Sequence, residues 1–188
     1  KASVHGDALP VLNAEELLAK EERQHILQEM RQLMNLPIAE YDQIFTEVLH
    51  RFAVFVQNIP ETEHSYYSNL GGLLDHALER TNLALYLCRT YLLPQDTTLE
   101  TVSENELRWV YAVFTASLLL DVGKIPTRHL IHLADAEGNP QEIWLPYNGA
   151  MLGQATHYLC GFREDTYEHM RHLVTPLVAR QILPAGIG

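Results

Sequence analysis

The chain has 188 residues, of which 47% are hydrophobic and 20% charged, and its formal net charge is −11 at pH 7. We expect one globular domain over residues 1–188, because this length buries a substantial core and this composition is typical of water-soluble proteins. The acidic charge argues against a broad electrostatic grip on nucleic acid, which requires clustered Lys and Arg. Uninterrupted apolar runs also stay shorter than the roughly 18 residues that a membrane span needs.

Cys88 and Cys160 make neither a CxxC pair nor a disulfide framework, which favours a reducing, cytosolic setting. The chain opens with KASVHGDALP, which has neither an initiator Met nor the residue order of a signal peptide. We therefore expect a fragment of a longer multidomain protein.

Hydrophobic spacing predicts helices along most of the chain. Asn13 and Glu16 form a capping-box pattern that opens the first segment, which is expected to break near Lys20. Apolar residues at spacings of three and four then mark successive helical faces. The helical segments predicted in this way cover residues 12–35, 36–60, 73–91, 105–123 and 164–184.

The hydrophobic period changes over residues 128–145. Two short alternating runs flank DAEGNP at 135–140, a turn composition typical of a β-hairpin. The last helical segment contains Pro176, which is expected to produce a kink. These patterns predict an all-α fold, a bundle of about seven to nine helices with one small β-hairpin.

Three residues are candidates for chemistry. Asp121 follows SLLL on a buried helix, where a carboxylate requires a metal, a base or a backbone donor to offset its desolvation. His76 lies in an apolar stretch and is either a metal ligand or a structural histidine. Lys124 lies one turn after Asp121, where it pairs with that carboxylate, meets a phosphate or is a surface lysine at a helix end.

Four segments have the order found in one family: GGLLDHALE (71–79), WVYAVFTASLLLDVGK (109–124), WLPYNGAM (144–151) and LVARQILP (177–184). The chain resembles the amino-terminal relaxase domain of TraI-like proteins from integrating conjugative elements and MobH-class plasmids, within the HD-hydrolase superfamily. The resemblance implies an HD-domain-like helical fold, a divalent metal (Mn, Fe or Mg) and nicking of DNA at a transfer origin. It matches His76 to the family's His after the double glycine and Asp121 to the Asp of its His-Asp pair.

The chain departs from the family pattern at several positions. Ser65, Tyr66 and Tyr67 stand where the family commonly carries three histidines, and Leu120 replaces the His of the His-Asp pair. His64 lies one residue before these three positions and is a candidate substitute for one of the missing histidines. A one-residue shift, however, usually turns a side chain away from the site. The resemblance therefore implies a degenerate metal site.

Later histidines are further candidate ligands. His157, His169 and His172 lie in the carboxyl-terminal half, and His169 and His172 share an i, i+3 helical face that a metal can bridge. The alternative interpretation is that they are partly exposed surface histidines. The predicted site thus comprises Asp121 and Lys124 as catalytic residues, with His76, Asp121, His169 and His172 as metal ligands.

Three functions remain open. The favoured one is a degenerate HD domain of a conjugative relaxase-like protein, which works with transfer-origin DNA and conjugation machinery in the bacterial cytosol. We expect Leu120 and the tyrosines to fill the old metal pocket, because a hydrocarbon and phenols with pKa values near 10 are poor ligands at neutral pH. The alternatives are an active metal-dependent nickase or phosphodiesterase and, by fold analogy alone, a nucleotide phosphohydrolase.

Overall fold

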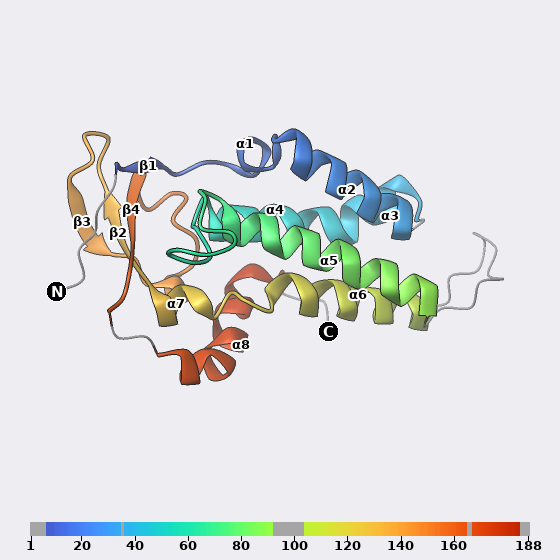
Figure 1. The fold of residues 1–188 in the computed structure, drawn as a ribbon. Coiled ribbons are helices and arrows are strands. Elements are labelled where there is room, and N and C mark those ends of the chain that lie inside the picture. Colours follow the sequence, from blue (N-terminus) through green and yellow to red (C-terminus); the bar gives the residue numbers. More distant parts are fainter. Residues whose placement is uncertain (1–6, 35, 92–103, 165–166, 185–188) are drawn as a thin grey trace.

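The computed structural model describes residues 7–34, 36–91, 104–164 and 167–184. A body of helices carries a small sheet at one end, on the left in Figure 1. The described elements, in chain order, are β1 (Leu9–Pro10), α1 (Ala14–Leu18), α2 (Glu21–Met34), α3 (Ile38–Tyr41), a π-helical turn (Asp42–Thr46), α4 (Glu47–Val56), α5 (Gly72–Tyr91), α6 (Glu104–Leu119), α7 (Lys124–Arg128), β2 (His129–Ala134), β3 (Pro140–Ile143), a 3₁₀ turn (Pro146–Asn148), β4 (His157–Phe162), a second 3₁₀ turn (Glu168–Met170) and α8 (Arg171–Ile182).

Local sequence signals set the first two helices. Asn13 Oδ1 accepts a hydrogen bond from Glu16 N at 2.9 Å and Glu16 Oε2 accepts one from Asn13 N at 3.0 Å, so the predicted capping box is confirmed. The predicted break separates α1 from α2. Arg23, in the first turn of α2, is only 2% exposed and donates to Asp75 Oδ1 at 2.6 Å and to the carbonyl of Leu17. One guanidinium therefore joins α1, α2 and α5.

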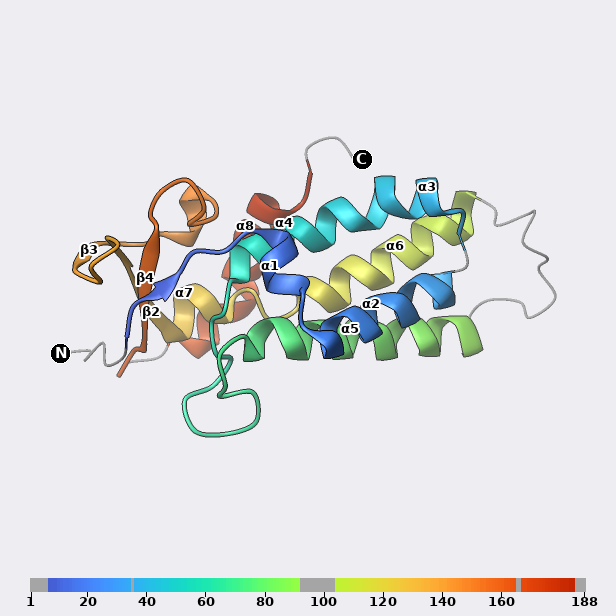
Figure 2. The same cartoon turned by 90° about the horizontal axis from the view of Figure 1, so that it is seen from above.

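The hydrophobic core lies among α4, α5 and α6. The predicted stripe on α4 is buried, with Val48, Leu49 and Phe52 each at most 3% exposed. Phe45, on the π-helical turn, meets Phe114 of α6 edge to face, with ring centroids 5.0 Å apart at 88°. Figures 1 and 2 both show α5 and α6 side by side along the body. The connection from α4 to α5 projects as a loop beside the start of α5 (Figure 2).

The predicted all-α fold is wrong. The expected hairpin is confirmed as the antiparallel pair β2–β3, but it belongs to a four-stranded antiparallel sheet of order β1-β4-β2-β3. β2 alternates buried residues such as Ile131 and Leu133 with less buried ones, and its second edge is completed by β4. A central strand pairs all of its backbone groups only when both of its edges are covered, so the hairpin alone does not complete β2. The domain is therefore mixed α/β, with helices dominant.

Residues Glu106–Arg128 are long and apolar enough to cross a membrane by length and composition alone. Buried core helices of globular proteins pass the same test, because they too are apolar on most sides. Half of the most apolar window in this stretch is buried inside the domain, and Phe114 and Leu118 belong to the hydrophobic core.

Candidate functional site

Glu61, His76 and Asp121 form the cluster of metal-type donors that the described residues bring together. One donor atom from each lies within 4.8 Å of the others. Glu61 comes from the loop after α4, His76 from the first turns of α5 and Asp121 from the turn between α6 and α7. Two of these three residues, His76 and Asp121, were candidates from the sequence, and the fold places them together.

Asp121 is held by three cations. The turn after α6 and the start of α7 place Lys124 three residues later, with Nζ 3.1 Å from Asp121 Oδ1. Arg80 Nη1 on α5 pairs with Oδ2, and Arg171 Nη1 on α8 lies 3.9 Å from Oδ1. Burial raises the pKa of Asp121, but Arg80 and Lys124 outweigh it and hold this pKa below its ordinary value. Asp121 is therefore a carboxylate fixed among cations.

The turn that presents Asp121 depends on a close helix contact. A Cβ at Gly123 would overlap Thr175 Oγ1 and lie 2.8 Å from the carbonyl oxygen of Arg171, so a larger residue would push α8 away from the turn. Because α8 stays close, Arg171 reaches Asp121. Close packing of α8 thus requires a glycine at position 123, two residues after Asp121.

Glu61 was missed by the sequence analysis. Its side chain is 4% exposed, Oε1 pairs with Lys124 Nζ, and Oε2 lies 2.5 Å from His76 Nδ1. His76 therefore donates through Nδ1, since the facing oxygen belongs to a carboxylate already paired with a lysine. Glu61 directly follows the helix-ending FAVFVQNIP segment. Its partners lie 15 and 63 residues away, so no local signal in this polar loop identifies it.

His129 fixes the backbone on both sides of the Glu61–Lys124 pair. Its ring is 2% exposed, with Nε2 2.7 Å from the carbonyl oxygen of Pro60 and Nδ1 3.1 Å from the carbonyl oxygen of Lys124. Burial lowers the pKa of His129, although both carbonyls oppose that shift. Because a neutral imidazole has one N–H, it donates to one of these carbonyls and packs against the other, and so lies between the loop that carries Glu61 and the first residue of α7.

Tyr67 covers the outer side of His76. The two rings stack with centroids 4.5 Å apart at 12°, and the Tyr67 hydroxyl donates to Glu79 Oε2 at 2.5 Å. The hydrogen bond to Glu79 raises the pKa of Tyr67 to about 12. Tyr67 has a φ of 62°, a left-handed conformation that is uncommon for a bulky residue. The uncommon backbone conformation of the loop therefore occurs at the residue whose ring stacks on His76.

The other positions that depart from the family pattern do not fill a pocket. Tyr66 is 89% exposed and Leu120 is 56% exposed, so the expectation that they close the old metal site is wrong. Ser65 is also exposed and donates to Thr62 Oγ1 at 3.2 Å. Leu120 faces outward because α6 ends at Leu119 and the chain enters a turn. Of Tyr66 and Tyr67, it is Tyr67 that packs against a residue of the cluster.

The remaining histidines lie elsewhere. His64 has an 85% exposed side chain beside Glu63. His169 and His172 are exposed, and among the described residues neither belongs to the Glu61–His76–Asp121 cluster. His157 lies on β4, with Nδ1 3.1 Å from Thr156 Oγ1.

A divalent metal does not fit the cluster as it is arranged. Each of the four carboxylate oxygens already faces a nitrogen: Lys124 at Glu61 Oε1 and Asp121 Oδ1, His76 at Glu61 Oε2, and Arg80 at Asp121 Oδ2. Lys124 and Arg80 thereby balance the two carboxylates in a largely buried place, while the more distant Arg171 is paired with Glu168 at 2.7 Å. Adding a doubly charged ion beside the ammonium would leave excess positive charge there, which is costly at low dielectric.

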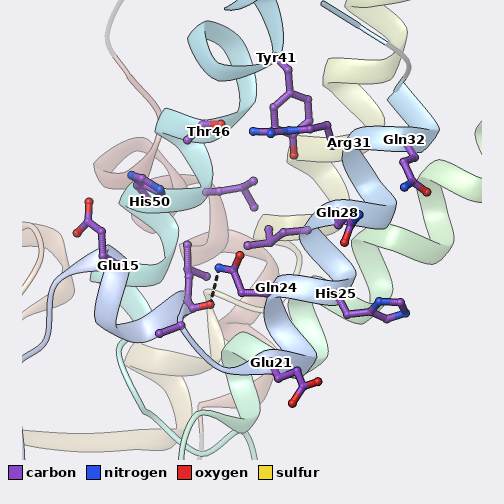
Figure 3. Close-up of a pocket in the computed structure, with 14 residues that line it drawn as sticks. Glu15, Glu21, Gln24, His25, Gln28, Arg31, Gln32, Tyr41, Thr46 and His50 are labelled. Carbon is purple, nitrogen blue, oxygen red and sulfur yellow. Dashed lines mark hydrogen bonds between the residues drawn. The ribbon is translucent and has the colours of Figure 1, made fainter. Parts of the chain in front are cut away.

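A separate open groove of about 1040 Å³ runs between α1, α2 and α4 (Figure 3). Gln24, Gln28 and Gln32 repeat every fourth residue along the α2 wall, and His50 lies on α4. Glu61, His76 and Asp121 do not line it. The groove is therefore distinct from the charged cluster.

Fold and site together define a mostly helical domain with a small antiparallel sheet and a charge-balanced cluster where a metal centre was expected. The model of the TraI_2 family, whose description reads "Putative helicase", matches residues 8–187. The chain belongs to this family, which is related to conjugative transfer. A comparison with curated proteins gave no match.

Proposed function

We propose that this domain is a non-cleaving module of the conjugative transfer apparatus, which contacts transfer-origin DNA or its protein machinery without cutting DNA. The observation that carries the proposal is the cluster itself. Glu61 and Asp121 are satisfied by Lys124 and Arg80, so the donors that would hold a catalytic ion are paired with each other and with cations. Without such an ion, this cluster cannot activate a water or polarise a phosphate by Lewis acidity.

The family context supports the biological setting of this proposal. Membership of a family related to conjugative transfer supports a role beside DNA and transfer proteins, and we propose that the domain works in the bacterial cytosol. We also propose a relationship to the HD-hydrolase superfamily, in which Leu120 stands in place of the paired His. Gly123 and Lys124 match the end of the phosphate-binding pattern G-x-x-x-x-G-K, but Leu118 stands at the position of its first glycine. We therefore propose no nucleotide-driven unwinding by this segment.

The acidic composition limits the strength of DNA binding that we expect from such a module. With a net charge of −11, contact with phosphates must be local, and binding by this domain alone should be weak and salt-sensitive. Tight, salt-insensitive binding to arbitrary duplex would contradict this expectation. Fluorescence anisotropy with a labelled origin duplex and a scrambled duplex, over a range of salt concentrations, measures it.

A nicking assay tests the proposal directly. Supercoiled plasmid carrying a transfer origin is incubated with the protein and Mn²⁺, beside a plasmid without the origin and beside Asp121→Ala. We expect no more open-circular DNA with the wild-type protein than with buffer. Nicking that requires the origin and disappears in Asp121→Ala would instead establish an active metal-dependent nickase.

A further inference from the structure

The ammonium of Lys124 lies where a cation shared by Glu61 and Asp121 would sit. Nζ contacts Glu61 Oε1 and lies 3.1 Å from Asp121 Oδ1. All three side chains are withdrawn from solvent, with exposures of 11% for Lys124, 4% for Glu61 and 10% for Asp121. A positive charge that bridges two buried carboxylates performs the electrostatic task of a metal ion at the same place.

The backbone keeps this ammonium in position. Lys124 is the first residue of α7, and its amide donates to the carbonyl of Asp121 at 2.9 Å. The buried ring of His129 lies between the carbonyls of Lys124 and Pro60, so it packs between the two chain segments that carry the Lys124–Glu61 pair. The pair is therefore built into the fold and is not a chance contact of a flexible lysine.

The donors around the ammonium are those that divalent metals use. Two carboxylates and one imidazole make a three-residue set, and their donor atoms are within 4.8 Å of one another. We infer that Lys124 is a tethered cation that takes the place of a divalent ion, so that removing this one charge turns Glu61, His76 and Asp121 into a metal-binding site. The inference concerns the same cluster as the proposed function, but its test requires no DNA.

The expected change in metal affinity is large. An ammonium and an ion about 4 Å apart repel strongly enough, at an effective dielectric constant of about 20, to weaken binding at least about a thousandfold. Lys124→Met removes that repulsion and frees Glu61 Oε1 and Asp121 Oδ1, while Arg80 stays on Asp121 Oδ2. It also leaves a buried carboxylate pair without its bridging charge, which a divalent ion can restore.

The experiment measures metal content and thermal stability of the whole chain. Wild type, Lys124→Met and Lys124→Gln are stripped with chelator, dialysed against Zn²⁺ or Mn²⁺ and analysed by plasma mass spectrometry. Lys20→Met is the matched control, because Lys20 is an exposed lysine far from the cluster in sequence. We expect about one equivalent of metal in the two Lys124 variants, with a metal-dependent rise in Tm, and almost none in wild type or the control.

A double variant identifies the ligands. Lys124→Met with Glu61→Gln removes one negative and one positive charge together, so the charge balance is restored without a metal. We expect this protein to fold and to bind no metal. One equivalent in wild type would overturn the inference, as would the absence of binding in a folded Lys124 variant. Failure of both Lys124 variants to fold at millimolar metal would also overturn it, because an ion that bridges the two carboxylates supplies the positive charge that these variants lack.

The outcomes separate this inference from the proposed function. Wild-type protein that nicks origin DNA with Mn²⁺ refutes the proposed function. Metal-free wild-type protein that neither nicks nor binds DNA leaves the tethered cation in place and removes only the assignment to DNA.

Discussion

Glu61 and Lys124 should be strongly coupled in their effect on stability. Glu61→Gln leaves Lys124 with Asp121 at 3.1 Å as its remaining carboxylate partner and takes one charged acceptor from His76. Breaking a buried ion pair by removing one partner typically costs about 3–5 kcal/mol. Because Lys124 keeps its contact with Asp121, Glu61→Gln should cost less, about 2–3 kcal/mol. Lys124→Met should cost about 3 kcal/mol, because it leaves Glu61 buried with His76 as its only described partner.

The double variant separates the pair from its surroundings. Because both charges disappear together, Lys124→Met with Glu61→Gln should cost less than the sum of the single variants, by about 1.5–3 kcal/mol. Urea unfolding at pH 7 with chelator, followed by circular dichroism, gives the four free energies, provided that the m-values agree. Glu63→Gln is the matched control: its side chain is 59% exposed, so its effect should stay within about 0.5 kcal/mol. Additivity of the single variants within about 0.5 kcal/mol would refute the coupling.

Two further predictions concern the backbone next to the cluster and its charge. Gly71→Ala should destabilise the fold by about 2 kcal/mol more than Gly153→Ala in urea unfolding. Both glycines have positive φ, but a Cβ at Gly71 would also overlap Arg23 Nη2, whereas a Cβ at Gly153 would meet open space. Equal effects would show that Arg23 moves freely. The folded-state pKa of Asp121 is depressed, so its stabilising contribution is present above its unfolded pKa of 3.8 and is lost as pH falls through the folded value. The difference in unfolding free energy between wild type and Asp121→Asn should therefore be constant from pH 7 to about pH 5 and shrink below pH 4; a difference that grows on acidification would contradict the sign.

Short-range signals in the sequence were sufficient for most helices. The capping box at Asn13, the break before α2 and the start of α5 at the double glycine depend on neighbours three or four residues apart, and the structure confirms them. The β2–β3 hairpin is equally local, because its turn joins adjacent strands. These are the features that propensity and spacing determine without knowledge of the rest of the chain.

The elements that were missed depend on distant partners. β4 becomes a strand because β2 and β1 pair with its two edges, and neither pairing can be read from its six residues. Glu61 lies in the polar stretch PETEHS, which is typical of a surface loop, and its partners are 15 and 63 residues away. The exposure of Leu120 depends on a helix ending one residue earlier. Such features follow from tertiary packing, which overrides local pattern.

The pairing of β1 with β4 constrains how the domain reaches its folded state. Leu9 pairs with Tyr158, and Pro10 pairs with His157. β1 therefore cannot pair until β4, about 150 residues later in the chain, has been synthesised. The helices from α1 to α6 complete their local contacts earlier during synthesis, and closing so long a loop is slow. Until residues 157–162 leave the ribosome, β2 has its second edge uncovered and is open to pairing with another chain. The sheet is therefore completed only after α1 to α6 have been synthesised, and its strand edges are exposed to misassembly until then.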